Sequence, residues 1–127
     1  MHDCNKVYAC QGLFRIVRAS DFAILKKNGS KIVSKSLVLL YDVYSSEGFC
    51  IRFAPIASKK IGGAVIRNKA KRVIRSMMLE VFRCSYNRFN GMLSLLIIAR
   101  PALLSRNHAT LIKEAEYCIN KIMSEVL

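Results

Sequence analysis

The residues from Ala64 to Arg83 read AVIRNKAKRVIRSMMLEVFR and contain the longest helical hydrophobic period in this 127-residue chain. Apolar side chains recur there at spacings of three and four, which places them on one face of a helix. That face comprises Ile66, Ala70, Val73, Ile74, Met77, Met78 and Val81. A one-sided apolar helix must pack on another layer, so the stretch predicts a helix lying on a sheet.

Strands are predicted on both sides of this helix. β-Branched, leucine and tyrosine residues predict one strand from Ile32 to Tyr44 and a second from Phe49 to Ala57. The polar turn at residues 45–48 would join them as a hairpin. Pro55 donates no hydrogen bond to a ladder, so it indicates a sheet edge or a bulge. A buried strand is predicted from Leu93 to Ala99, ended by Arg100 and Pro101.

Two further helices complete the expected order. Ser20 is the predicted N-cap of a short helix that Asn28 and Gly29 close, and a final amphipathic helix is predicted from Asn107 to Val126. The order α-β-β-α-β-α predicts an α+β fold, a two-layer sandwich. With no repeat or linker, residues 1–127 are expected to form a single domain, with residues 1–12 irregular.

The charge of the chain points to a polyanionic partner. Lys and Arg total 21 against 8 Asp and Glu, a formal net charge of +13. From Arg52 to Arg106 there are 12 basic residues and one acid, Glu80. The excess therefore belongs to the middle of the fold and not to a tail. Nucleic acid is the first candidate and an anionic membrane surface the second.

The basic residues form ridges on the central helix. Arg67, Lys71 and Arg75 are successive i, i+4 neighbours, and Asn68 and Arg72 form a second ridge, both expected to lie away from the apolar stripe. Like charges at this spacing repel each other, whereas phosphates would neutralise them. A solvated basic face and a membrane-lying helix are the alternatives. The apolar residues at core spacing disfavour the membrane.

The sequence lacks the residue patterns that other classes of function require. The chain contains no run of ~18 apolar residues that would span a bilayer, and no secretory signal, so a cytoplasmic location is expected. Its five cysteines are scattered and odd in number, which argues against zinc and disulfides and for reduced thiols. The acids are dispersed and no Ser-His-Asp or Cys-His spacing occurs, so neither catalytic nor metal-ligating residues are expected.

The stretch from Ser58 to Arg75, SKKIGGAVIRNKAKRVIR, resembles the signature of the bacterial ribonuclease P protein family. That family carries GNAV-x-RNR-x-KR-x-x-R directly after an SKK strand end. Asp21 and Phe22 before Gly29 resemble its first helix, and Ile97-Ile98-Ala99-Arg100 resembles the strand before its last helix. The resemblance runs from about Leu13 to the C-terminus.

The resemblance implies a fold with a left-handed βαβ crossover around the basic helix, against the usual hand. It implies a protein subunit of ribonuclease P that binds the catalytic RNA and the 5′ leader of precursor tRNA. The RNA subunit, and not the protein, is expected to catalyse the endonucleolytic cleavage that matures the 5′ end. The expected cofactor is Mg²⁺ held mainly by the RNA, with no organic cofactor. The protein is expected to have no membrane partner and to be monomeric alone.

The family's functional residues are carried over by position. The residues expected to bind the catalytic RNA are Lys59, Lys60, Arg67, Asn68, Lys69, Lys71, Arg72 and Arg75. Those expected at the leader are Phe22, Val38, Leu40, Arg67 and Lys71. The chain departs from the family at Gly63, where Asn is usual, and at Lys69, where Arg is usual. Lys26 and Leu40 also stand where cleft aromatics are frequent.

Two other functions remain open on composition alone. A ribosomal or other structural RNA-binding protein could use the same two-layer fold, and the RNR-like motif favours ribonuclease P over it. RNA cleavage by the protein alone would require activity without added RNA, which the scattered carboxylates disfavour.

Overall fold

The computed structural model describes residues 12–16, 19–44, 47–85 and 88–126. They form a five-stranded sheet, three α-helices and one 3-10 helix, which confirms the α+β class. The elements are β1 (Gly12–Arg15), α1 (Ala19–Asn28), β2 (Ser30–Val33), β3 (Leu37–Tyr44), β4 (Phe49–Ile56), α2 (Ala64–Ser85), β5 (Gly91–Ala99), η1 (Pro101–Ser105) and α3 (His108–Val126).

The strand order is β1-β4-β5-β3-β2, so the predicted hairpin between residues 32–44 and 49–57 is wrong. β5 lies between β3 and β4, antiparallel to the first and parallel to the second. Eight of its nine residues are buried, on both faces of the sheet. A strand that is apolar on both faces is most stable at the centre, and this preference separates two strands that are neighbours in sequence.

The predicted strand from Ile32 to Tyr44 is two strands. β2 and β3 pair antiparallel around residues 34–36, where Ser34 N donates to Leu37 O at 2.8 Å. Two serines and a lysine suit this turn because their side chains bond to the local backbone or to solvent. The sequence pattern also missed β1, which pairs parallel with β4. Gly12, expected to be irregular, begins β1; residues 1–11 lie outside the described part.

Pro55 lies at a sheet edge, as predicted. β1 ends at Arg15, opposite Phe53 of β4, and Ile16 N then donates to Phe53 O at 2.8 Å. Backbone groups alternate in direction along a strand, so Pro55 faces the same side as Phe53. On that side of β4 no described strand pairs beyond the end of β1, so the missing N–H of Pro55 costs no ladder hydrogen bond.

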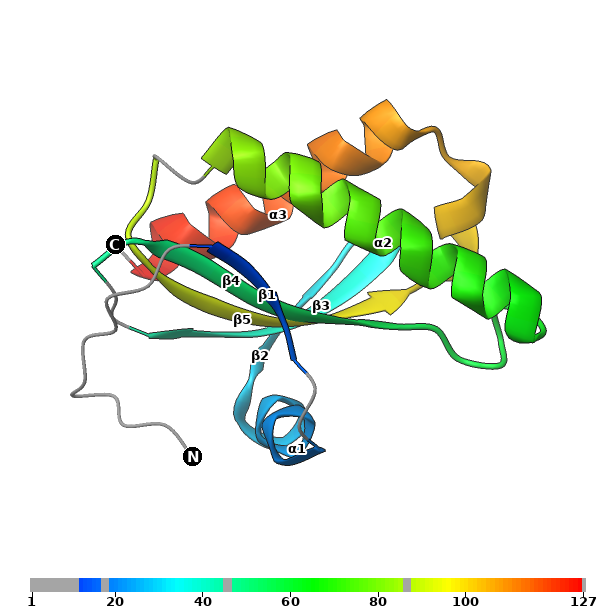
Figure 1. The fold of residues 1–127 in the computed structure, drawn as a ribbon, viewed down its shortest axis with the longest axis horizontal. Coiled ribbons are helices and arrows are strands. Elements are labelled where there is room, and N and C mark those ends of the chain that lie inside the picture. The colour runs from blue at the N-terminus through cyan, green and yellow to red at the C-terminus, as the bar shows by residue number, and fades with distance from the viewer. Residues whose placement is uncertain (1–11, 17–18, 45–46, 86–87, 127) are drawn as a thin grey trace.

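Helices α2 and α3 cover one face of the sheet, and α1 lies against the other (Figure 1). The main core lies between the sheet and α2 and α3, which confirms the two-layer sandwich. Odd-numbered residues of β3, β4 and β5 point into it, including Leu39, Ile51 and Leu95. Even-numbered residues face α1, where Ile16, Leu25, Ala54 and Leu96 form a smaller buried cluster.

The unit β4-α2-β5 joins two neighbouring parallel strands through a helix. In Figure 1 β1 marks the near edge of the sheet, so β5 lies behind β4; both strands run from left to right, and α2 returns above them. A unit with this arrangement is left-handed, as the family resemblance implied. Most such crossovers are right-handed.

The helix ends follow the sequence closely. α1 begins at Ala19, so Ser20 lies in its first turn and is not the N-cap. Gly29 closes the helix with its N–H on Leu25 O at 3.0 Å. Asn107 caps α3, since its Oδ1 accepts from Thr110 N at 2.8 Å.

Candidate RNA interface

Helix α2 supports the predicted RNA-binding residues. Ala70, Ile74, Met77 and Val81 are buried against the sheet and anchor the helix. Its first turns project past the end of the sheet in Figure 1. Ile66 was predicted on the core face but is 43% exposed, because the core does not reach that turn.

The first ridge, Arg67, Lys71 and Arg75, is partly buried. The prediction that this ridge lies away from the apolar stripe is therefore wrong. Each i+4 step turns about 40° around the helix, so a line starting at Arg67 runs beside the buried residues. The Nε atoms of Arg67 and Arg75 are buried without a hydrogen-bond partner among the described residues. Partial burial restricts these side chains, so less entropy is lost when they bind a ligand.

The second ridge is exposed. Asn68 and Arg72, together with Val65 and Arg75, line a shallow open pocket on the flank of α2. Lys69 is exposed as well, but it lies about 200° around the helix from Arg67. The structure therefore brings Asn68, Arg72 and Arg75 together, while Lys69 lies opposite Arg67 and about 60° around the helix from Arg72.

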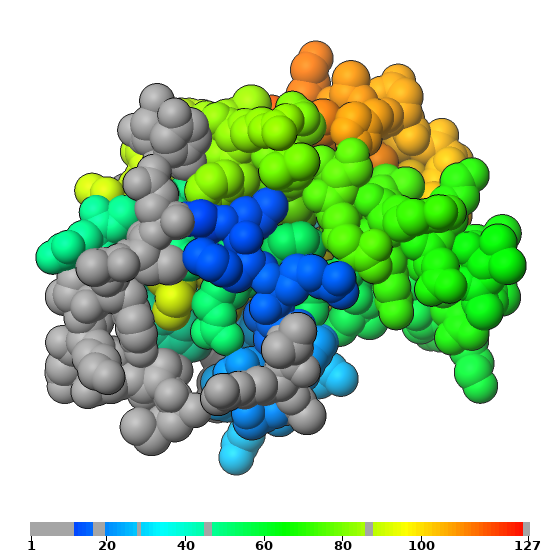
Figure 2. Space-filling view, in the orientation of Figure 1, coloured from blue at the N-terminus to red at the C-terminus, as the bar shows by residue number. Residues whose placement is uncertain are grey.

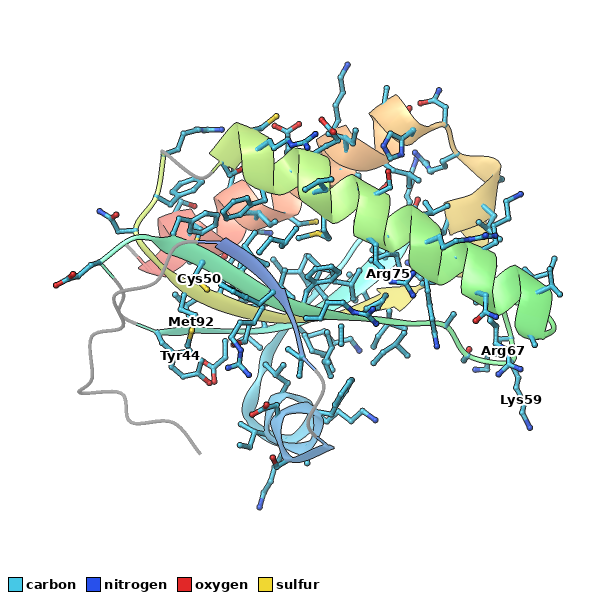
Figure 3. All side chains as sticks on the ribbon, in the orientation of Figure 1. Tyr44, Cys50, Lys59, Arg67, Arg75 and Met92 are labelled. Atoms are coloured by element: carbon cyan, nitrogen blue, oxygen red, sulfur yellow. The ribbon has the colours of Figure 1, made fainter. Side chains whose placement is uncertain are left out.

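Lys59 and Lys60 are exposed in the turn that leads into α2. Ile61 N donates to Ser58 O at 3.0 Å, which folds this turn. Figure 3 shows Lys59 and Arg67 at the same end of the molecule, with Arg75 further along the helix. Gly63 takes the N-cap position of α2, and its carbonyl accepts from Arg67 N at 2.9 Å. The two lysines thus extend the cationic surface beyond the start of the helix.

The protein supplies little counter-charge to this surface. The first turn of α2 contains no acid, although helix N-termini favour one. Glu80 is the single acid of the helix and pairs with Arg83 at 3.0 Å, two turns beyond the ridges. Among the described residues no ion pair involves Arg67, Lys71, Arg72 or Arg75. The surface is suited to phosphate groups, which guanidinium can bind bidentately.

The apolar residues expected at the leader lie on the α1 side of the sheet. Phe22 and Leu40 are partly buried against the cluster of Leu25 and Leu96. Val38 is two residues from Leu40 on the same face, opposite Ile98 of β5. Asp21 fixes α1 to β4 through an ion pair with Arg52 at 3.0 Å. Phe22 is thus partly core, and its side chain is not fully covered.

Arg67 and Lys71 come from α2, whose core residues pack on the opposite face of the sheet. The five predicted leader residues are therefore divided between the two faces of the sheet. Figure 2 shows the edge of the molecule as a notched surface, with β1 and α1 in blue on one side and α2 and its preceding loop in green on the other. Beyond the end of β1, β4 is the outermost strand of this edge among the described residues.

Phe14 is an aromatic residue at this edge that the sequence pattern missed. It is 48% exposed and stands opposite Arg52 in the register of β1 and β4. Its ring lies over Gly12, where a Cβ would come within 3.0 Å of two ring carbons. Nothing in the sequence indicated this position, because a strand of four residues such as β1 is too short to show an alternating pattern.

Comparisons with known proteins agree with the signature. A family model described as Ribonuclease P matches residues 12–123. This chain belongs to the ribonuclease P protein family. It is accordingly a protein subunit of ribonuclease P, the endoribonuclease ribonucleoprotein of tRNA 5′ maturation.

Individual relatives extend over most of the chain. The ribonuclease P protein component of Clostridium kluyveri is 31% identical over 111 residues, covering 86% of this chain and 94% of the relative. That of Maridesulfovibrio salexigens is 30% identical, covering 70% and 68%. A solved structure of the Staphylococcus aureus RNase P protein is 26% identical, with a TM-score of 0.59, and covers 86% and 96% of the two chains.

Two negative findings apply to the described residues. No helix among them is both long and apolar enough to cross a membrane. They bring together no group of three His, Cys, Asp or Glu side chains that would hold a metal ion.

Proposed function

We propose that the α2 surface binds the catalytic RNA subunit and that the α1 side of the β4 edge receives the 5′ leader of precursor tRNA. The observation that carries the proposal is the uncompensated cationic surface at the start of a rigidly packed helix. Its docking residues are the predicted RNA-binding set, in which the exposed Lys69 stands beside Arg72 and opposite Arg67. The protein is monomeric on its own in this proposal and acts in the cytoplasm.

The protein contributes positioning and not bond cleavage. Cations at the RNA surface reduce phosphate repulsion, so the RNA folds and holds its substrate at lower Mg²⁺. We assign Mg²⁺ to the RNA because the described carboxylates are dispersed over the molecule. Orientation of the leader relative to the RNA lowers the entropic part of the barrier.

Reconstitution tests the RNA partnership. The chain mixed with a bacterial ribonuclease P RNA transcript should cleave precursor tRNA at Mg²⁺ concentrations where the RNA alone is weak. The protein without RNA should be inactive. Absence of stimulation would contradict the proposal, and cleavage by the protein without RNA would favour a protein-only nuclease. Equal affinity for a ribosomal RNA fragment and for the transcript, without stimulation of cleavage, would favour a general RNA-binding protein.

The leader is tested separately through Phe22. Phe22→Leu keeps apolar packing against Leu40 but removes the ring on which a base would stack, a contribution of about 1–3 kcal/mol. We expect weaker binding of precursor tRNA with a leader of several nucleotides and unchanged binding of leaderless tRNA. Phe14→Leu, at the exposed edge, should give the same pattern. Equal losses with both substrates would indicate a folding role.

A further inference from the structure

The carboxyl ends of β4 and β5 and the start of β3 lie at one end of the sheet. Ile56 stands opposite Ile98, and Leu37 stands opposite Ala99. One step further, Arg100 N donates to Ser36 O at 2.9 Å. Neighbouring strands are about 4.8 Å apart. The turn with Lys59, the residue Arg100 and the turn with Lys35 are therefore consecutive along this sheet end.

Cations from three segments meet on the β3 side of this end. Lys35 is the central residue of the β2–β3 turn, Arg100 follows β5, and Arg106 follows η1. Arg100 Nη1 donates to Ser34 O at 2.6 Å, and Arg106 Nη1 lies 3.9 Å from Glu114 Oε1. Lys35 is exposed and has no hydrogen bond or ion pair among the described residues. We call Lys35, Arg100 and Arg106 the sheet-end triad.

The triad rests on a built polar network. Glu114 of α3 accepts from Ser34 Oγ, from Ser36 N at 2.9 Å and from Ser36 Oγ at 3.1 Å. This carboxylate is 13% exposed, so it neutralises part of the charge from beneath and leaves the outer surface cationic. A cationic turn held in one conformation by a partly buried acid is preorganised for an anion.

Both long helices begin at this end and add to its positive potential. The first turns of α2 and α3 contain no acid, and their N-terminal N–H groups carry the positive end of the helix dipole. Among the described residues there is no acid in the turn with Lys59 and Lys60, in the first turn of α2, at Arg100 or in the first turn of α3. Two helix N-termini and five cations with one partly buried acid favour a polyanion over a protein partner.

We propose that the sheet-end triad is a second contact for the RNA subunit, which continues the α2 surface across the ends of β4, β5 and β3. The inference rests on the proposed function, since it extends the same RNA across the molecule. The RNA backbone would lie over Lys59 and Lys60, pass Arg100 and reach Lys35 and Arg106. The triad is a phosphate-binding surface with no base recognition assigned to it.

The test is the salt dependence of binding to a bacterial ribonuclease P RNA transcript. Each lost phosphate contact lowers the slope of log K against log salt by about 0.7–0.9. The variant Lys35→Ala/Arg100→Ala/Arg106→Ala should lower it by about two and weaken binding by about tenfold or more at moderate salt. Arg100→Lys/Arg106→Lys, which keeps the charge, should retain the wild-type slope.

Lys35→Glu separates binding from folding, because Lys35 makes no contact whose loss would unfold the protein. It should reduce RNA affinity while leaving the melting temperature unchanged. Lys121→Glu, an exposed lysine on the later part of α3, is the matched charge change and should have a smaller effect.

Equal effects of Lys35→Glu and Lys121→Glu, or an unchanged slope in the triple variant, would overturn the inference. The proposed function fails differently. In that case wild-type protein would not stimulate cleavage, and Arg67→Ala/Arg75→Ala would leave the slope unchanged as well.

Discussion

At the residue scale, Glu114 shows how one carboxylate joins two distant segments. Burial alone raises the pKa of Glu114, but hydrogen bonds from Ser34 and Ser36, with Arg106 nearby, outweigh it and lower the pKa below its ordinary value of 4.5. A lowered folded-state pKa means that the ionised carboxylate stabilises the fold. That stability is present above the unfolded-state pKa and is lost as the pH falls through the folded-state pKa.

Glu114→Gln should therefore destabilise the protein at neutral pH. Hydrogen bonds to a charged group contribute about 1.5–3 kcal/mol, and the amide retains part of this. The free energy of unfolding, measured by urea denaturation from pH 7 to pH 3, should differ most at pH 7. The two curves should converge as the pH falls through the lowered pKa of Glu114 and the wild-type carboxylate becomes protonated. A constant difference across this range would mean that Glu114 acts through packing.

Gly63 and Gly62 allow a matched pair of substitutions before α2. A Cβ at Gly63 would meet no atom within 4 Å, whereas Gly62 has φ +150° and a Cβ there would lie 3.0 Å from Ile66. Asn is favoured over Gly at an N-cap by a few tenths of a kcal/mol. Gly63→Asn should raise the melting temperature slightly, and Gly62→Asn should lower it by several degrees. A fall with Gly63→Asn would show that the backbone there excludes a side chain.

The role of a single residue could be predicted where it depends on that residue's own chemistry. It was missed where it depends on partners that are far away in the sequence. Pro55 indicated an edge because a missing N–H has the same consequence in any sheet. The role of Glu114 was not visible, since its partners Ser34 and Ser36 are about 80 positions away in the chain. Phe14 was missed because its surroundings depend on β1 pairing with β4.

At the element scale, α2 was the most predictable part of the molecule. Its period gave the start at Ala64, and the observed helix ends at Ser85, two residues past the prediction. The error concerned burial: Ile66 extends past the core while Arg67 and Arg75 lie beside it. Periodicity defines a face of a helix but not the length over which the neighbouring layer covers it.

The strands were less predictable than the helices. The predicted hairpin is wrong because strands that are neighbours in sequence are not neighbours in this sheet: β5 inserts between β3 and β4. Nothing in residues 32–57 encodes that insertion. It follows from the apolar character of β5, some 40 residues further along the chain.

Removing the partly buried arginines of α2 should change RNA binding in a measurable way. For Arg67→Ala/Arg75→Ala we expect a salt slope lower by about one unit per lost phosphate contact. Both side chains are partly buried, so a circular dichroism melt must first show that the variant is folded. Arg83→Ala is the control, since Arg83 pairs with Glu80 away from the ridges. Loss of affinity with an unchanged slope would exclude direct phosphate contact.

At the scale of the whole molecule, the cations of the α2 ridges, of the turn before α2 and of the sheet-end triad lie at one end of the sheet and along one flank of α2. The β4-α2-β5 unit produces this arrangement, because its two strands are parallel and α2 therefore starts at the sheet end where β5 also finishes. Lys59, Arg67 and Arg100 thereby lie at the same end of the fold, although they span 42 positions of sequence. The fold thus brings basic residues that are distant in the sequence together on one cationic surface.

This concentration predicts that anions stabilise the isolated protein. A net charge of +13 repels itself, so raising NaCl from low to moderate concentration should raise the melting temperature by a few degrees. Tripolyphosphate at matched ionic strength should raise it further, because a ligand that binds only the folded state stabilises it by mass action. The extra increment should shrink in Arg67→Ala/Arg75→Ala and in Lys35→Ala/Arg100→Ala/Arg106→Ala, and persist in Lys121→Ala. Equal increments in all variants would mean that polyanions act through general screening and that the cationic surface contains no preorganised phosphate sites.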